Sequence, residues 1–381
     1  MIEKEMKVPF IDIARYESGF QQEWLAKVST MSATSQFIGG SEVSTLEERL
    51  KSILEVRYAV GCANGTDAIQ LGLRALGITG GDVVLVPNAT FWATFEAVVN
   101  VGGVPVTVDI DLNDGGIDLQ AFEDAVKAEK PKAAVVAHLY GWGTKHILAL
   151  RALCIQHDVL LIEDGAQCFG VRHQGVPLLK GALISTTSFY PAKVLGAAGD
   201  AGAVFTNDSE LADRVRRLGN HGRTAHYGYG DVGWNSRLDS LQAAFLNLSM
   251  NYIDNRIQSR RQSAEEYQVR LPLVGLIPMK PPIGYAENGY CNVCLLPDST
   301  KKDNLEAMLK SRNIGFGNIY PGAMSVQNGA KKYLKQHYGG SNAEQLSKSV
   351  LNLPLFAYMK KEEIDYVIES VQHAMMTGER V

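Results

Sequence analysis

Apolar and polar positions alternate along the first half of the chain in two repeating patterns. Between Arg57 and about Phe205, short apolar runs are separated by stretches with apolar residues at helical spacing, such as TDAIQLGLRALG and LQAFEDAVKAEK. Several runs are apolar throughout, which is typical of strands covered on both faces. Strands that alternate with helices predict an α/β fold with a mainly parallel central sheet and helices on both faces. The predicted strands are RYAVGCA, DVVLVP, VPVTVDI, AAVVAHL, DVLLIED, TTSFYP and GAVF.

The pattern changes in the second half of the chain. Residues 210–261 are mostly helical, with one interruption by the tyrosine- and glycine-rich segment HGRTAHYGYGDVGWN. Beyond Arg270, proline-rich turns, a strand near 290–296 and helices near 303–311 and 362–375 indicate a smaller α+β unit. We therefore expect two domains. Residues 1–255 form a large α/β domain with an N-terminal helical segment, and residues 256–381 form a small C-terminal α+β domain.

Composition and charge exclude several classes of protein. The 381 residues are 46% hydrophobic and 20% charged, which is ordinary for a globular protein with a sizeable core. The formal net charge is −4 and no basic stretch stands out, so we expect no nucleic-acid partner. The N-terminus MIEKEMKV lacks the apolar core of a signal peptide. The most apolar window, 89–108, is broken by Glu96, a Gly-Gly pair and Pro105, so we expect no membrane span.

The five cysteines form no disulfide framework, which suits a cytoplasmic protein. Cys291 and Cys294 form a CxxC pair, but residues three apart on a strand point to opposite faces. No second pair or nearby histidine completes a four-ligand zinc set. We therefore predict no metal site.

One lysine lies in a stretch that is otherwise suited to burial. In TSFYPAKVLGAAGDAGA, Lys193 and Asp200 are the charged residues among small, apolar and aromatic ones. Most lysines are solvated surface groups. A desolvated lysine, however, loses proton affinity, and its free amine becomes a nucleophile for a carbonyl. The stretch therefore permits a lysine that forms a Schiff base, provided that the rest of the chain supplies a cofactor site.

Polar and aromatic residues follow several of the predicted strands, where open α/β sheets bind ligands. Gly65 and Thr66 begin a helix, and its free N–H groups suit either a phosphate or an ordinary N-cap. Phe91 follows the next strand, as a core residue or a ring for stacking on a flat ligand. Asp164 ends a buried strand and needs a partner there, such as a protonated ring nitrogen. With Lys193, these residues are the equipment for pyridoxal 5'-phosphate (PLP).

The order of these pieces resembles the DegT/DnrJ type of nucleotide-sugar aminotransferases, PLP-dependent enzymes with an aspartate-aminotransferase-like fold. The resemblance covers nearly the whole chain. Its lysine segment and its NSRLD segment are the most specific pieces. The matching segments are FIGGSEVSTLEERL, YAVGCANGTDAIQLGLRALGI, HLYG, IEDGAQ, SFYPAKVLGAAGDAGA, NHGR, WNSRLDSLQAA and IYPG.

The resemblance implies a role for each candidate residue. Lys193 would form the Schiff base and move the proton, and Asp164 would pair with the pyridine nitrogen. Tyr320 of IYPG and Arg237 of NSRLD are expected to contact the substrate. The other cofactor contacts implied are Gln167 to the phenolic oxygen, Phe91 to the ring face, Gly65, Thr66 and Ser188 to the phosphate, and Asn235 to the phosphate of the neighbouring subunit.

The resemblance also implies the reaction. L-glutamate would convert PLP to pyridoxamine phosphate and leave as 2-oxoglutarate. A nucleotide-linked keto sugar would then receive the amine, giving an amino sugar for surface polysaccharide or secondary-metabolite synthesis. The enzyme would be a homodimer with shared active sites. Val194, Phe169 and Ser325 stand where the family often has asparagine, histidine and histidine, near the expected sugar or nucleotide. These departures bear on the acceptor more than on the cofactor.

Two alternatives remain at this point. A PLP-dependent sugar dehydratase of the same family would use the same cofactor, but such relatives typically carry histidine at the lysine position, and Lys193 counts against this reading. A non-catalytic regulatory protein on the same fold is the other alternative, because fold does not fix function. Such a protein would tolerate the loss of Lys193 or Asp164, and this chain keeps both residues.

Overall fold

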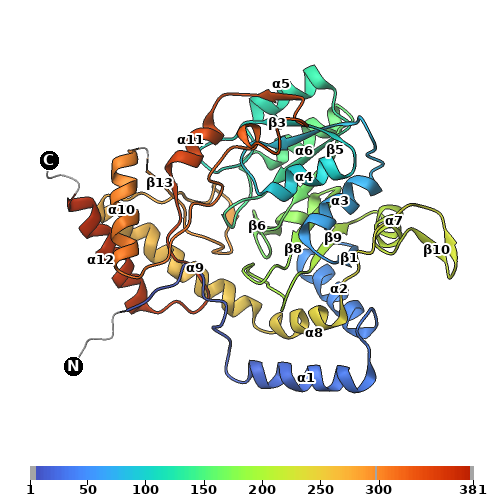
Figure 1. Cartoon of the computed structure of the whole chain (residues 1–381), viewed down its shortest axis with the longest axis horizontal. Helices are drawn as coiled ribbons and strands as arrows, with labels where there is room; N and C mark the ends of the chain where they lie inside the picture. Colours follow the sequence, from blue (N-terminus) through green and yellow to red (C-terminus); the bar gives the residue numbers. More distant parts are fainter. Residues whose placement is uncertain (1–5, 297, 378–381) are drawn as a thin grey trace.

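The centre of the molecule is an eight-stranded sheet (Figure 1). The computed structural model describes residues 6–296 and 298–377. β9 is antiparallel to both of its neighbours, and the remaining pairs within the sheet are parallel. This arrangement confirms the mainly parallel sheet that the sequence predicted. In spatial order the strands are β1 (Tyr58–Cys62), β9 (Gly202–Thr206), β8 (Ile184–Ser188), β5 (Leu160–Asp164), β4 (Ala133–Ala137), β2 (Val83–Pro87), β3 (Val104–Val108) and β14 (Gln336–Tyr338).

Helices cover both faces of the sheet (Figure 1). The apolar residues of α3 (Gly65–Ala75), α4 (Trp92–Asn100) and α7 (Ser209–Gly219) join one face in a single core cluster. The opposite face packs against two further clusters, built from α5 (Leu119–Glu129) and α6 (Ile147–Gln156) on one side and α2 (Ser41–Leu54) and α8 (Ser240–Ser249) on the other. Because both faces are buried, β4 and β9 are apolar or small throughout, as strands of such sheets are.

The C-terminal part forms a second core around the long helix α9 (Ile253–Arg270). That helix runs from the sheet domain into a cluster with α10 (Ser299–Ser311) and α12 (Lys361–Thr377). The short antiparallel pair β13 (Cys294–Leu295) and β15 (Val350–Leu351) lies in this part, and α11 (Asn342–Ser349) leads into it. The strand expected near 290–296 is thus confirmed, although it covers fewer residues.

Two segments lie across the boundary expected between the domains. β14, which lies in the C-terminal part of the sequence, adds to the large sheet in parallel with β3. Val8, near the N-terminus, pairs with Ile314 and is buried in the C-terminal core. The two cores are therefore built by segments that are interleaved along the sequence.

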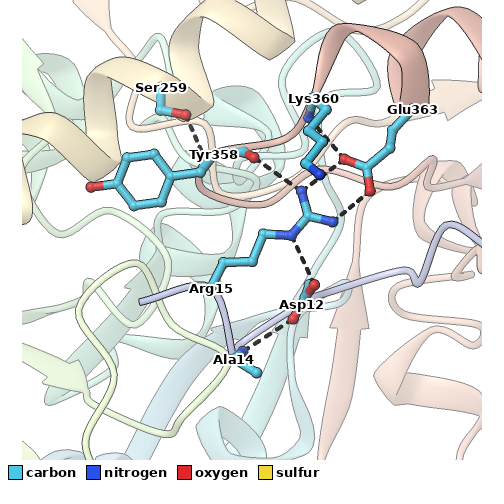
Figure 2. A network of polar contacts seen from close by, with 7 residues as sticks. All are labelled: Asp12, Ala14, Arg15, Ser259, Tyr358, Lys360 and Glu363. Atoms are coloured by element: carbon cyan, nitrogen blue, oxygen red, sulfur yellow. Dashed lines mark hydrogen bonds and ion pairs between the residues drawn. The ribbon is translucent and has the colours of Figure 1, made fainter. Parts of the chain in front are cut away.

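An ion-pair network fastens the N-terminal segment to the small core (Figure 2). The Arg15 guanidinium donates to Asp12 Oδ2 at 2.8 Å, to Glu363 Oε2 at 2.7 Å and to the carbonyl oxygen of Tyr358 at 3.0 Å. Although burial opposes ionisation of Glu363, its hydrogen bonds with Arg15 and with the Lys360 N–H hold the pKa of that carboxyl below its usual value. The segment that precedes α1 (Phe20–Thr34) is thereby fixed next to the start of α12.

The remaining strands are short. β6 (Arg172–His173) pairs with both β7 (Val176–Pro177) and β12 (Tyr285–Ala286), and β10 (Arg223–Ala225) and β11 (Gly228–Tyr229) form a protruding hairpin (Figure 1). Tyr227, at the tip of this hairpin, is 84% exposed. None of the helices among the described residues has the length and apolar character needed to cross a bilayer.

Candidate active site

The predicted site residues gather at the carboxyl-end edge of the parallel strands. Asp164 is the last residue of β5, and Ser188 is the last residue of the neighbouring strand β8. Gly65 begins α3 directly after β1, and Phe91 precedes α4 directly after β2. Side chains that lie far apart in the sequence therefore meet at one edge, because parallel strands end on the same side of a sheet.

Lys193 is held in a loop that hydrogen bonds and packing define. The loop is closed by bonds from Phe189 N–H to Ala201 O at 2.8 Å and from Ala197 N–H to Phe189 O at 2.7 Å. A Cβ on Gly196 would lie 2.4 Å from the carbonyl oxygen of Pro191, so the turn after the lysine requires glycine. The apolar residues of the loop thus anchor it in the core, while Lys193 itself is half-buried.

Asp164 is a nearly buried carboxylate that lacks a cationic partner among the described residues. Its exposed fraction is 8%. Oδ2 accepts a hydrogen bond from Thr94 Oγ1 at 3.0 Å, and Oδ1 accepts one from the Ala166 N–H at 3.1 Å. A buried carboxylate is stabilised by a positive partner as well as by hydrogen bonds. The protonated nitrogen of a pyridine ring is a partner of the kind that this environment calls for.

The adjacent acid, Glu163, faces the opposite side of the sheet and has its partners within the protein. Successive residues of a strand face opposite sides of the sheet, and Glu163 is fully buried. It accepts hydrogen bonds from Arg151 Nε at 2.7 Å and pairs with His138 Nε2 at 2.9 Å. Although burial acts in the opposite direction, these two partners keep the pKa of Glu163 below its usual value. Glu163 is thus satisfied within the protein and leaves Asp164 as the acid available to a ligand.

The first turn of α3 offers free backbone N–H groups that suit a phosphate. A Cβ on Gly65 would lie 2.6 Å from Ser188 Cβ, so glycine allows the helix to begin directly against the end of β8. The Asn64 side chain accepts from the Asp67 N–H at 2.8 Å and caps the helix. The first N–H groups of a helix have no acceptor within it, which leaves those of Gly65 and Thr66 for an anion.

Gln167 links the site to Tyr320. Gln167 Nε2 donates to the Tyr320 hydroxyl in a very short hydrogen bond, and Gln167 Oε1 accepts from the Tyr140 N–H at 2.6 Å. Burial raises the pKa of the Tyr320 phenol well above its usual value, so this group remains a neutral hydroxyl. The structure therefore brings Tyr320, expected at the substrate, into direct contact with Gln167, expected at the cofactor.

Phe91, Asn235 and Arg237 are less enclosed. Phe91 is 64% exposed at the start of α4, so a face of its ring is free for a flat ligand. Asn235 is exposed, and with Arg237 and Asn64 it lines a cavity of about 420 Å³. Arg237 Nη1 donates to Asn220 Oδ1 at 3.2 Å. Asn235 and Arg237 thus lie beside the β1–α3 turn, whereas Tyr320 lies beside Gln167.

The residues present fit PLP on grounds of geometry and charge. The unpaired acid Asp164, the glycine cradle at Gly65 and the exposed ring of Phe91 correspond to the ring nitrogen, the phosphate and the ring face of that cofactor. Lys193 supplies an amine in the loop that follows β8. Sequence reasoning missed two polar neighbours, Thr94 at Asp164 and a tyrosine at Lys193 that is described below. Thr94 lies four residues after Thr90 and contacts it. This spacing of two threonines was the signal in the sequence that could have indicated the contact.

The fold and the site define the chain as an α/β aminotransferase. Residues 20–372 match the DegT/DnrJ/EryC1/StrS aminotransferase family, and the chain belongs to that family. This confirms the family and the aminotransferase class expected from the sequence.

Three similar proteins illustrate the range of the family. A UDP-2-acetamido-2-deoxy-3-oxo-D-glucuronate aminotransferase of Pseudomonas aeruginosa is 34% identical over 94% of this chain and 98% of its own. A pleiotropic regulatory protein of Geobacillus stearothermophilus is 33% identical over 96% of this chain and 98% of its own. The crystal structure of S. venezuelae DesV in complex with a ketimine intermediate has a TM-score of 0.91 at 31% identity, covering 98% of this chain and 99% of DesV.

Proposed function

We propose that this aminotransferase uses PLP to transfer the amino group of L-glutamate to a nucleotide-linked keto sugar. The observation that carries the proposal is a nearly buried carboxylate, Asp164, at the end of β5 that lacks a cationic partner among the described residues. The loop after the neighbouring strand β8 carries an amine, Lys193. The Pseudomonas relative is named for a UDP-linked keto sugar acceptor, which supports the acceptor class.

The residues of the chain have complementary tasks in this proposal. When bound, PLP supplies an electron sink for the bonds at the amino carbon. Lys193 binds the cofactor covalently through Nζ and, once released, takes a proton at Nζ and returns it. The Asp164 carboxylate keeps the ring nitrogen protonated, because an adjacent negative charge favours the cationic form. The Thr94 hydroxyl fixes the orientation of that carboxylate.

The remaining residues bind and orient. Gly65, Thr66 and Ser188 hold the phosphate, and the Phe91 ring lies against the cofactor ring. Gln167 serves the phenolic oxygen. Its bond with Tyr320 places the tyrosine where the substrate arrives. The phenol stays protonated because burial raises its pKa, so it acts as a hydrogen-bonding group and does not add charge.

The proposal includes a homodimer in which Asn235 serves the phosphate of the neighbouring subunit. Its exposure and its place on the cavity beside the β1–α3 turn support an intermolecular role. Arg237, on the same cavity, is proposed to contact the substrate from that side. The free cysteines and the nucleotide-linked acceptor suit the cytoplasm, with an amino sugar for surface polysaccharide or secondary metabolites as product.

A regulatory role is favoured by the names of some relatives, such as the Geobacillus protein. A purely regulatory protein does not need a lysine and an unpaired acid at one sheet edge, and this chain retains both. A sugar dehydratase of this family is expected to carry histidine at the position of Lys193, so this lysine also counts against the dehydratase alternative. Catalysis of amino transfer is therefore the function that the site supports best.

The decisive experiment is a screen of nucleotide-linked keto sugars with L-glutamate, followed by mass spectrometry and NMR of the products. We expect an amino sugar together with an equal amount of 2-oxoglutarate. A deoxygenated keto sugar as product would instead establish a dehydratase. Formation of neither product across UDP-, dTDP- and GDP-linked acceptors would reject the proposal.

A further inference from the structure

A tyrosine that the sequence analysis placed in a strand lies against the amine of Lys193. Lys193 Nζ donates a hydrogen bond to the Tyr290 hydroxyl at 3.4 Å and lies 5.1 Å from the centroid of the tyrosine ring. Within residues 6–296 and 298–377, this hydroxyl is the hydrogen-bond partner of Nζ. Tyr290 belongs to the loop between β12 and β13 and packs against the core cluster that contains Phe189 and Leu195 of the lysine loop.

The Asn288 side chain fastens this loop to the segment that follows β5. Its side chain is fully buried. Nδ2 donates to the carbonyl oxygens of Gln167 at 3.0 Å and Phe169 at 2.9 Å, and Oδ1 accepts from the Tyr290 N–H at 2.9 Å. One amide therefore ties the backbone of Tyr290 to the loop that carries Gln167.

The other side of the loop packs directly on α9. A Cβ on Gly289 would lie 2.5 Å from Arg260 Cβ, so only glycine allows this approach. Arg260 Nη1 donates to the Gly289 carbonyl oxygen at 3.3 Å. The loop is thus fixed between α9 and the segment that follows β5, and it presents the Tyr290 hydroxyl at a defined position. A loop that served only as a connection would not need contacts on both sides.

We propose that Tyr290 is a positioning residue for Lys193, whose hydroxyl accepts a hydrogen bond from Nζ and holds the amine in place whenever it is not bonded to the cofactor. The proposal rests on the proposed function, because it takes Lys193 as the cofactor lysine. A lysine side chain rotates about several bonds when its amine is free, so Nζ can occupy many positions. Proton transfer requires that Nζ stay within hydrogen-bond reach of the reacting carbon, and a fixed acceptor restricts its motion.

Several charged groups lie around the pair. Arg15 and Arg256 are each paired with a glutamate, whereas Arg260 is buried and donates to the carbonyl oxygens of Gly289 and Leu355. Burial lowers the pKa of Arg260 to about 10. Arg260 is thus a charge beside the Tyr290 loop that has no carboxylate partner among the described residues. The other titratable and charged groups that line the cavity at Lys193 or lie near Tyr290 are Asp12, Arg15, Tyr16, Arg256, Arg260, Cys291 and Tyr320.

The test compares Tyr290→Phe with the matched control Tyr285→Phe. Tyr285 lies on the same segment, and its hydroxyl donates to the Thr144 carbonyl oxygen at 2.8 Å, away from Lys193. The first measurement uses the cofactor-free protein. Trace acetylation with acetic anhydride is followed across pH by mass spectrometry of the Lys193 peptide, with exposed Lys130 as internal reference. We expect the apparent pKa of Lys193 to fall by about half a unit or more in Tyr290→Phe only, because a bond to the charged form is lost.

The second measurement is steady-state kinetics of both variants. In Tyr290→Phe we expect kcat to fall about tenfold with little change in KM, the effect of one lost hydrogen bond to a charged group. An unshifted Lys193 pKa would overturn the proposal, whether or not kcat falls, because Tyr290 would then not act through Nζ. Equal shifts in both variants would also overturn it. Borohydride trapping of the wild-type protein separately decides whether Lys193 carries the cofactor, so failure of the proposed function is distinguished.

Discussion

Thr94 donates a hydrogen bond of 3.0 Å to Asp164, from the first turn of α4 to the end of β5. Both side chains are buried, and Thr94 Oγ1 also contacts Thr90 Oγ1 at 2.9 Å. The threonine therefore fixes the rotamer of a carboxylate whose proposed task depends on its direction. Among the described residues, Thr94 is the member of α4 that hydrogen-bonds to the acid, so this hydroxyl couples the helix to the site.

We predict that Thr94→Val slows both half-reactions by about fivefold to tenfold, because one hydrogen bond to a charged group is lost. Single-turnover absorbance changes with glutamate and with the keto acceptor measure the two steps. Thr186→Val is the matched control, since Thr186 is a strand partner of Asp164 and its buried hydroxyl has no hydrogen-bond partner among the described residues. Equal rates in the two variants would remove Thr94 from the site.

The second prediction concerns the identity of the cofactor lysine. We expect the purified protein with PLP to show a visible absorption band that disappears on treatment with borohydride. Peptide mapping should then find the pyridoxyl label on Lys193, the amine at the carboxyl-end edge of β8. The Lys193→Ala protein should bind PLP without a reducible band. A label on any other lysine would contradict the assignment.

The third prediction tests the phosphate cradle. In Gly65→Ala, the new Cβ would lie 2.6 Å from Ser188 Cβ, and the start of α3 must move away from β8. We expect PLP affinity, titrated by absorbance, to fall at least about tenfold, because the N–H groups no longer converge on the phosphate. Gly80→Ala is the control, since a Cβ there meets nothing within 4 Å. Similar affinities of both variants would place the phosphate elsewhere.

The placement of Asp164 at a strand end could be predicted from the sequence, because it follows from strand order and local chemistry. The end of β5 was visible as an apolar run that closes on Asp164, whereas β8 is the mostly polar ISTTS and ends at Ser188, before the end of the predicted strand TTSFYP. The structure confirms the mainly parallel sheet. β14 was not predicted, because its sequence, QHY, is short and polar and its pairing with β3 joins residues that are distant along the chain.

Contacts between distant side chains were also beyond sequence reasoning. The requirement that an acid at a strand end be paired was foreseen, but not that Arg151 and His138 would satisfy Glu163. Tyr290 was assigned to a strand, whereas the structure begins β13 at Cys294. Its approach to Lys193 depends on Asn288 and Gly289, which contact segments more than a hundred residues and about thirty residues away, respectively.

The fourth prediction follows from the Arg15–Glu363 contact (Figure 2). The folded-state pKa of Glu363 is lowered, so its contribution to stability is fully present above the unfolded-state pKa and is lost as pH falls through the folded-state pKa. We expect Glu363→Gln to lower Tm at neutral pH and the difference from wild type to shrink below about pH 4. Glu362→Gln, one residue earlier on the exposed side of α12, should show no such convergence. A Tm difference that is independent of pH would contradict this expectation.

The last prediction tests whether active sites are shared between subunits. Asn235 is exposed on the cavity beside the β1–α3 turn, and in the proposed homodimer it serves the cofactor phosphate of the neighbouring chain. Lys193→Ala and Asn235→Ala chains would each be impaired alone. In a mixed dimer, one site collects both lesions and the other collects neither, so mixing should restore up to about half of wild-type activity per dimer. Native mass spectrometry verifies subunit exchange, and Asn207→Ala, an exposed asparagine at the far end of β9, replaces Asn235→Ala as the control. If exchange is complete and both parents are clearly impaired, yet mixing restores no activity, then each site is built by a single chain.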